Sequence, residues 1–332
     1  MAAGAYILAP AGPDLSRDEA AFFRDAQPWG FILFQRNCVA PDQVTRLTAA
    51  LRDAVGWHAP ILIDQEGGRV QRMREPHWRE YLPPLDQVPA GGRAMYLRGL
   101  LIGTELMDVG IDVNCSPSAD IARDKTHPFL RNRCYGEYAD VVVAMSASCA
   151  DGLMDAGCLP VLKHAPGHGL AVQDSHEELP RITAPLSYLE HHDFEPFRRL
   201  ADLPMFMTAH LVLPEIDPET PVTLSPAGIR LLRDSLGLTG LLMTDDISMG
   251  ALTGTVAERG RRAIAAGCDL VLHCNGDFNE MKSLANALPG PMRESSARRA
   301  EAALAARKTP IDVDIPALEA EFTALITGAV NA

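Results

Sequence analysis

Eight short apolar runs are spaced along the chain, separated by longer segments that mix polar and apolar residues. The runs do not alternate polar with apolar positions, and this is the pattern of strands covered on both faces. We therefore interpret them as buried parallel strands. They are AYILA from Ala5, GFILF from Gly30, PILID from Pro60, IDVNC from Ile111, LPVLK from Leu159, PMFMT from Pro204, LLMTD from Leu241 and DLVLH from Asp269.

The segments between these runs have the composition of helices. Gly157 and Gly267 follow two of them, where a glycine suits a helix C-terminus. An eightfold strand and helix series predicts an α/β fold of the (β/α)8 or TIM-barrel type, with residues 1–332 forming a single domain and 311–332 a covering segment that ends in a helix. The predicted barrel helices are 17–25, 42–55, 93–109, 139–156, 187–201, 226–235, 256–266 and 278–288.

The amino-acid composition indicates which classes of partner and which cellular compartment to expect. The chain has 332 residues, 47% of them hydrophobic, and a net charge of −13, which is unlike the basic face of a nucleic-acid-binding protein. The N-terminus has no basic region followed by a long apolar stretch, so we expect neither a signal peptide nor a membrane partner. The seven cysteines are scattered and form no CxxC pair, as in proteins with reduced thiols. We therefore expect a cytoplasmic protein.

Chemically distinctive residues follow the ends of the predicted strands. Asp64 ends the third run and Asp245 the seventh, while Lys163 and His164 end the fifth. Asp120 and Arg133 lie in the loop after the fourth run and His210 follows the sixth. Barrel enzymes build their active sites from the carboxyl ends of the strands, so these side chains predict a site there. Asp245 is a candidate nucleophile in this position, although an aspartate here can also cap the following turn.

The segment LKHAPGHGLAVQDSHEELP, residues 162–180, holds the highest density of ionisable groups in the chain. Asp174 precedes His176 by two residues, a spacing that allows the carboxylate to orient the imidazole for proton transfer near neutral pH. The alternative interpretation is a solvated loop. His164 and His168 have a spacing that could bind a metal on a helix, but Pro166 and Gly167 argue against a helix, so we expect no metal site.

Several motifs taken together identify a resemblance. KHAPGHG followed by DSH, DQEGGRVQR at 64–72, ILFQRN at 32–37, GIDVNCSPSADI at 110–121 and TDDISM at 244–249 resemble the family-3 glycoside hydrolases, in particular the single-domain bacterial β-N-acetylglucosaminidases. This likeness implies a retaining hydrolase that removes terminal N-acetylglucosamine (GlcNAc) from β-linked glycans. It implies no cofactor, and a small carbohydrate partner such as GlcNAc-anhydroMurNAc, with or without peptide, in cell-wall recycling.

The resemblance also implies roles for individual residues. The family's nucleophile falls on Asp245, its general acid/base on His176 and the carboxylate that assists this histidine on Asp174. The family's sugar-binding groups correspond to Asp64, Arg72, Arg133, Lys163 and His164. A His176 carried on a glycine-bounded loop is expected to approach the substrate only when the loop closes.

The sequence departs from the family pattern at positions near these motifs. Leu170 and Ala171 replace a common Asp-Thr, Ala165 stands where an aromatic residue is frequent, and Cys134-Tyr135 replaces Ser-Phe. Within the family, a preference for β-glucosides or transfer of the sugar to phosphate remains an alternative. A non-catalytic sugar-binding barrel is the alternative from another functional class, and the joint presence of Asp245, Asp174 and His176 argues against it.

Overall fold

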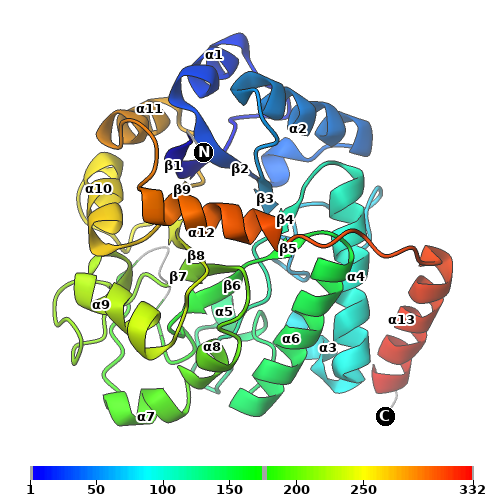
Figure 1. Cartoon of the computed structure of the whole chain (residues 1–332). Helices are drawn as coiled ribbons and strands as arrows, with labels where there is room; N and C mark the ends of the chain where they lie inside the picture. Colours follow the sequence, from blue (N-terminus) through cyan, green and yellow to red (C-terminus); the bar gives the residue numbers. More distant parts are fainter. Residues whose placement is uncertain (1–2, 174–177, 331–332) are drawn as a thin grey trace.

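The computed structural model describes residues 3–173 and 178–330 and shows parallel strands arranged around a common axis, with helices outside them (Figure 1). Each of the eight predicted runs contains a strand. The strands are β1 (Gly4–Leu8), β2 (Pro28–Leu33), β3 (Ile61–Ile63), β4 (Val113–Asn114), β5 (Leu159–Pro160), β6 (Leu162–Ala165), β7 (Met205–Thr208), β8 (Leu241–Asp246) and β9 (Leu270–His273).

The nine labelled strands occupy eight positions of a barrel. Their order is β5-β4-β3-β2-β1-β9-β8-β7-β6, and all of the pairings are parallel. β5 and β6 are two parts of one extended segment interrupted at Val161. The first part pairs with β4 and the second with β7, so this segment joins the two ends of the sheet. The predicted (β/α)8 barrel is therefore confirmed.

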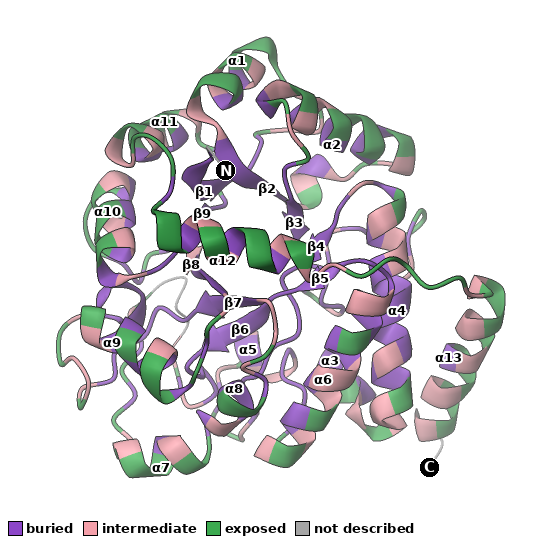
Figure 2. Cartoon of the chain, in the orientation of Figure 1, coloured by how far each residue is buried: buried purple, intermediate pink, exposed green. Residues whose placement is uncertain are grey.

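Both faces of the strands are buried, as the continuous apolar runs predicted (Figure 2). Residues pointing to the barrel axis, among them Ile7, Leu62 and Met243, form an inner cluster. Their neighbours on the same strands, such as Leu8 and Ile63, pack outward against the helices in a second, larger cluster. Because successive side chains of a strand face opposite ways, this double burial fixes which side chains reach the pocket end of the barrel.

The helices begin and end largely where the sequence signals place them. Ser16 and Glu19 form a capping box at the start of α1, and Thr255 and Glu258 form another at the start of α10. Gly267 ends α10 with a φ of 120°, a left-handed conformation that glycine adopts readily. The helices are α1 (Arg17–Ala26), α2 (Pro41–Val55), α3 (Pro84–Gln87), α4 (Gly91–Asp108), α5 (Pro128–Arg131), α6 (Ala139–Asp155), α7 (Leu186–His191), α8 (Glu195–Arg199), α9 (Pro226–Arg230), α10 (Val256–Ala266), α11 (Phe278–Ala287), α12 (Glu294–Ala305) and α13 (Ile315–Val330).

One predicted helix, 187–201, is divided into α7 and α8. The chain turns between them at Asp193, a buried residue whose carboxylate receives both terminal nitrogens of Arg123 at 2.8 Å. Pro196 lacks the N–H needed to continue a helical hydrogen-bond series across the turn. A long-range ion pair therefore lies at the break between the two parts of the expected helix.

Helix α12 was not predicted, and it closes the N-terminal end of the barrel, where it crosses the strands in Figure 1. Ala300 and Ala303 join the inner apolar cluster, while Asp269 accepts hydrogen bonds from Ser296 Oγ at 2.7 Å and from Arg299 Nη1 at 3.0 Å. Helix α13 lies outside the barrel beside α4, where Phe322 is buried. The end of the barrel opposite to α12 remains available for a site.

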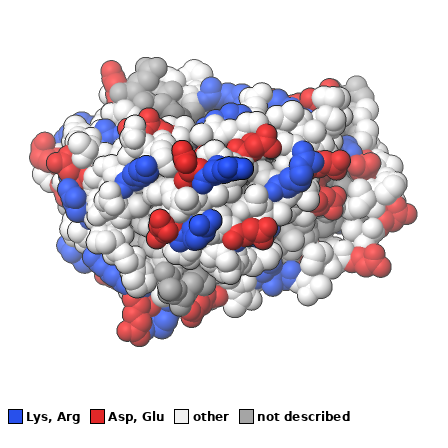
Figure 3. All heavy atoms as spheres, turned by 90° about the horizontal axis from the view of Figure 1, so that it is seen from above, with Lys and Arg blue, Asp and Glu red and all other residues white. Residues whose placement is uncertain are grey.

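The surface view shows acidic and basic side chains interspersed among uncharged ones on the visible face (Figure 3). No helix in the described part of the chain is both long enough and apolar enough to span a bilayer.

Candidate active site

Residues from four strand positions line one pocket at the carboxyl ends of the strands. The empty space in the pocket is about 500 Å³, a volume that includes space open to solvent. Six of the residues predicted for the site line it together with His168, and two aromatic or aliphatic side chains of α5 add an apolar wall. The predicted residues are Asp64, Arg72, Arg133, Lys163, His164 and Asp245.

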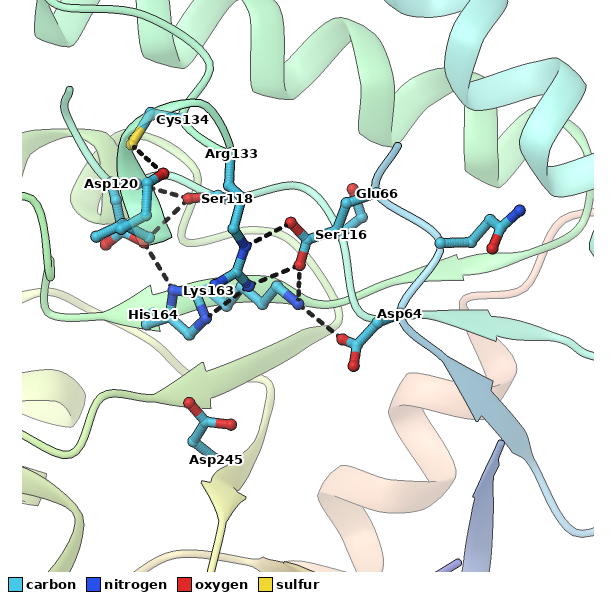
Figure 4. A network of polar contacts seen from close by, with 12 residues as sticks. Asp64, Glu66, Ser116, Ser118, Asp120, Arg133, Cys134, Lys163, His164 and Asp245 are labelled. Atoms are coloured by element: carbon cyan, nitrogen blue, oxygen red, sulfur yellow. Dashed lines mark hydrogen bonds and ion pairs between the residues drawn. The ribbon is translucent and has the colours of Figure 1, made fainter. Parts of the chain in front are cut away.

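Asp64 follows β3 and accepts hydrogen bonds from two cations, of which Figure 4 shows Lys163. Lys163 Nζ lies 2.9 Å from its Oδ1, and Arg72 Nη2 lies 3.0 Å from its Oδ2. Burial would raise the pKa of this carboxyl, but the two adjacent positive charges outweigh burial and hold the pKa well below its usual range. Asp64 is therefore an ionised hydrogen-bond acceptor at the pocket wall.

Glu66, two residues further on, holds the other side of the same cluster. Its Oε2 accepts from Arg133 Nε and its Oε1 from Arg133 Nη2, both at 2.8 Å, and Lys163 Nζ lies 2.5 Å from Oε1. Burial opposes ionisation of Glu66, but Arg133 and Lys163 lower its pKa to about 2. This two-point contact of a planar guanidinium with a carboxylate is the strongest and most directional form of ion pair.

Asp120 and His164 form a buried pair on the adjacent side of the pocket. His164 Nδ1 lies 2.7 Å from Asp120 Oδ2, which also accepts from Ser118 Oγ at 3.0 Å. Burial opposes the charge of Asp120, yet the contacts with His164 lower its pKa to about 2. Because Asp120 is an acceptor, the proton of this pair lies on Nδ1, and Nε2 of His164 faces Arg133 Nη2 at 3.5 Å.

Asp245 lies on β8, separated from β6 by β7, and its carboxylate is directed toward the charged cluster (Figure 4). Its Oδ1 accepts the backbone N–H of Asp246 at 2.8 Å. Burial raises the pKa of this carboxyl, but His164, His210 and the Asp246 N–H outweigh burial, so the net shift is downward. A strand thus holds an ionised carboxylate beside the groups that would bind a ligand.

The histidines that could have suggested a metal site have other surroundings. His210 lies 2.8 Å from Thr223 Oγ1 through Nδ1 and 2.9 Å from the Asp246 carbonyl through Nε2. His168 is buried, neither of its ring nitrogens has a hydrogen-bond partner among the described residues, and burial lowers its pKa to about 4. Among residues 3–173 and 178–330, no three His, Cys, Asp or Glu side chains are grouped in a way that could hold a metal ion.

The start of the loop after β6 is attached to the loop after β4. The His168 N–H donates to Asp120 Oδ1 at 2.6 Å, and Thr126 Oγ1 donates to the Gly169 carbonyl at 2.6 Å. A Cβ at Gly169 would lie 2.1 Å from the Ile121 carbonyl oxygen, so this close approach requires glycine. Asp174 and His176, the predicted proton-transfer pair, lie outside the described residues.

The DQEGGRVQR segment forms a loop braced by its own side chains. Gln65 Oε1 accepts the backbone N–H groups of Arg72 at 2.9 Å and Met73 at 3.0 Å. Buried Arg98 donates to the Glu66 and Leu82 carbonyls behind the loop. Gly67 has a φ of 103°, and a Cβ at this position would collide with the Arg98 guanidinium. The loop therefore presents Asp64, Glu66 and Arg72 on a fixed backbone.

Two residues of this cluster received no role in the sequence analysis. Glu66 lies inside the quoted DQEGGRVQR motif, and Asp120 was placed at this end of the barrel without a partner. The signal that could have found Glu66 was its spacing, since a charged residue two positions after a strand end faces the same side as Asp64 in extended chain. The partners of Glu66 and Asp120 are more than 40 residues away in sequence, so only the fold shows which cations and which histidine they hold.

The assembled groups suit a neutral ligand rich in hydroxyls. The charges of Asp64, Glu66 and Asp245 are matched by those of Arg72, Arg133 and Lys163, so the cluster has no large excess of either sign. Hydroxyls can donate to the carboxylates and accept from the cations. A carboxylate that is ionised and held on a strand, as that of Asp245 is, has the chemistry of a nucleophile.

Comparisons with known proteins agree with this arrangement. The family described as Glycosyl hydrolase family 3 N terminal domain matches residues 8–301. A β-hexosaminidase of Alkalilimnicola ehrlichii is 38% identical over 286 residues, which cover 83% of this chain and 82% of that protein. A β-hexosaminidase of Pseudomonas aeruginosa is 33% identical over 284 residues, which cover 82% of each.

Solved structures show the same likeness in three dimensions. NagZ from Neisseria gonorrhoeae, in complex with N-trifluoroacetyl-D-glucosamine, has a TM-score of 0.84 at 28% identity, and the match covers 100% of this chain and 98% of that one. A family-3 β-N-acetylglucosaminidase from Paenibacillus has a TM-score of 0.87 at 28% identity, covering 98% of this chain and 66% of that one.

Proposed function

Since this chain belongs to glycosyl hydrolase family 3 and is a glycoside hydrolase of the β-N-acetylhexosaminidase type, we propose that it is a retaining exo-β-N-acetylglucosaminidase. The observation that supports this most directly is the position of Asp245. Its ionised carboxylate shares one pocket with Asp64, Arg133, Lys163 and His164, which are suited to bind the hydroxyls of a terminal sugar.

The proposed reaction has two steps. Asp245 attacks the anomeric carbon, a bond forms between its carboxylate oxygen and that carbon, and the bond to the aglycone oxygen breaks. The departing oxygen takes a proton from the general acid. Water then attacks the same carbon, gives its proton to the same group acting as base, and releases Asp245. Two displacements restore the original configuration at the anomeric carbon.

We assign the acid and base role to His176 and its orientation to Asp174, on the basis of the DSH motif. The support from the described residues is indirect. The backbone before this motif, at His168 and Gly169, is fastened to the loop after β4 beside the pocket. His164 is a less suitable proton donor, because its Nδ1 is already bound to Asp120 and its Nε2 faces the Arg133 guanidinium.

The proposed natural substrates are muropeptide fragments, namely GlcNAc-anhydroMurNAc with or without peptide, processed in cell-wall recycling. A cationic side chain of the pocket wall, Arg72, supports an aglycone that carries carboxylates. All seven cysteines are unpaired, which fits a reducing compartment and the proposed cytoplasmic location.

Product analysis tests this proposal. The purified protein is incubated with GlcNAc-anhydroMurNAc and, separately, with chitobiose, each with and without inorganic phosphate. We expect free GlcNAc from both and a kcat/KM about tenfold or more higher for the muramic acid compound, as one additional charged hydrogen bond would provide. Formation of GlcNAc-1-phosphate would show a phosphorylase, and preferential cleavage of β-glucosides would show a glucosidase. If no substrate is turned over, a non-catalytic sugar-binding barrel is the hypothesis that remains.

A further inference from the structure

Glu66 is a charged residue of the cluster that does not line the pocket. It is in direct contact with two cations that do, Arg133 and Lys163. Both are bound to Glu66 from behind. The Glu66 side chain is only 2% exposed, against 16% for Asp64. Asp64 can therefore meet a ligand directly, whereas Glu66 can act only through the residues that it holds.

We propose that Glu66 is a positioning residue, which fixes Arg133 and Lys163 relative to each other so that they bind neighbouring groups of the sugar together. This inference rests on the proposed function and adds to it the residue that organises recognition of the terminal sugar.

The geometry of the three side chains supports this role. A guanidinium bound through Nε and Nη2 cannot rotate about its own axis without losing one of the two contacts, so Glu66 sets the plane of Arg133 as well as its position. The edge of Arg133 that remains is directed toward His164 and the pocket. Because Glu66 Oε1 is shared with Lys163 Nζ, the same carboxylate also fixes the distance between the two cations.

Lys163 in particular requires such support. Its ammonium ends a flexible stem, and a free lysine would lose considerable side-chain entropy on binding a ligand. Here the ammonium is shared between Asp64 Oδ1 and Glu66 Oε1. If a sugar hydroxyl takes over part of the Asp64 contact, Glu66 still holds the ammonium in place. The loss of entropy then occurs on folding and not on binding, which is the advantage of a preorganised site.

Glu66 is itself held on both sides. Its N–H donates to the Val70 carbonyl at 2.8 Å, and its carbonyl accepts from Nη2 of buried Arg98. The glycines at 67 and 68 have φ values of 103° and 58°, and they allow the chain to turn away directly after Glu66. The EGGR part of the motif can thus be explained as a carboxylate on a fixed backbone followed by a turn that leads to the pocket wall.

The test compares substrates as well as variants. Rates are measured for wild type, Glu66→Gln and Glu66→Asp on 4-nitrophenyl β-N-acetylglucosaminide and on its 3-deoxy, 4-deoxy and 6-deoxy analogues. Glutamine keeps the size of the side chain but places an N–H₂ group where a cation must be bound. Aspartate keeps the charge but is too short to reach both cations. Glu80→Gln, an exposed partner of Arg74 on the same loop, is the control.

We expect Glu66→Gln to lower kcat/KM for the intact substrate by about 10- to 100-fold, the effect of a lost hydrogen bond to a charged group. The decisive result is the ratio of intact to deoxy substrate. Wild type should disfavour at least one deoxy analogue, and Glu66→Gln should reduce that preference severalfold, because the cations no longer meet the missing hydroxyl. Glu66→Asp should retain part of the preference, and Glu80→Gln all of it.

A merely structural role for Glu66 would lower the rates for all substrates equally and leave the ratios unchanged, and this outcome would overturn the proposal. If Glu66→Gln does not fold, the same ratios from Glu66→Asp decide the matter. If the wild type is active and the variants keep its substrate ratios, only the proposed role of Glu66 is contradicted. Wild type that turns over none of the substrates contradicts the proposed function, and this inference with it.

Discussion

Asp64, Glu66 and Asp120 remain ionised at neutral pH although they lie in or directly behind the wall of the pocket. Burial opposes their charge in each case, and neighbouring cations or hydrogen-bond donors reverse its effect. Each carboxylate is thus part of a pair or triad and would be costly to leave alone, since removing one partner exposes the full desolvation cost of the other. These residues hold the site in place as well as forming it.

At the same scale, His176 can be tested by the leaving groups of its substrates. His176→Ala should reduce kcat/KM on GlcNAc disaccharides by roughly 10² to 10⁴-fold, the usual contribution of a general acid. The loss on 4-nitrophenyl β-N-acetylglucosaminide should be much smaller, because nitrophenolate departs without a proton. Steady-state kinetics with both substrates measures the difference. The control is His191→Ala, at an exposed histidine of α7. Equal losses on the two substrates would exclude His176 as the acid.

The location of single residues in the pocket could be predicted from the sequence when their position relative to a strand end decided it. Asp64, Lys163, His164 and Asp245 follow or end apolar runs, and the structure places all four in the pocket. The spacing of Glu66 after the strand end indicates only which side it faces, because its importance depends on contacts with Arg133 and Lys163 across the barrel. Long-range ion pairs of this kind arise only once the chain has folded.

At the scale of secondary-structure elements, the barrel strands could be predicted because burial on both faces leaves an unmistakable apolar run. The helices were less uniform. The 187–201 helix is divided at Asp193 by its ion pair with Arg123, and α12 was missed although its alanine-rich sequence has high helix propensity. Its role at the end of the barrel depends on Asp269, which lies more than 20 residues earlier. Local propensity does not report such a contact.

The packing of α13 beside α4 leads to a prediction about pH. Glu105 of α4 accepts the Arg79 N–H at 3.4 Å, and Arg79 also pairs with Glu319 of α13 at 2.6 Å. Burial, the largest cause, raises the pKa of Glu105 to about 7. Between pH of about 4.3 and about 7 the folded protein therefore holds a proton that the unfolded chain releases, and stability should fall as pH rises across this interval.

Replacing Glu105 by glutamine removes this titration. We expect Glu105→Gln to raise the free energy of unfolding by on the order of 2 kcal/mol at pH 8 and to change it little at pH 4, where the carboxyl is protonated in both states. Chemical denaturation at several pH values measures the effect. The control is Glu321→Gln. Glu321 lies on α13, is exposed and pairs with Arg93 of α4, so its replacement should not alter the pH dependence of stability between pH 5 and 8. A variant that is less stable than wild type at pH 8 would contradict the argument.

At the scale of the whole molecule, the two ends of the barrel serve different functions. Helix α12 closes one end. Two buried carboxylates lie there: Asp112 pairs with Arg307, and Asp269 pairs with Arg299 of α12. The other end carries the pocket and the loops that surround it. This separation allows the loops to be specialised for a substrate while the closed end contributes stability. The family-3 membership, the barrel and the pocket thus all support a site formed by the groups around Asp245.

The most direct measurement is to trap the covalent intermediate. The protein is treated with a 2-acetamido-2-deoxy-5-fluoro glycoside, digested and analysed by mass spectrometry, with Asp245→Asn treated in parallel. We predict one glycosyl unit on wild type, carried by Asp245, and none on the variant, together with a loss of turnover of roughly 10⁴-fold or more, as found for other nucleophiles. A label on another residue, or an Asp245→Asn variant that remains fully active, would contradict the account.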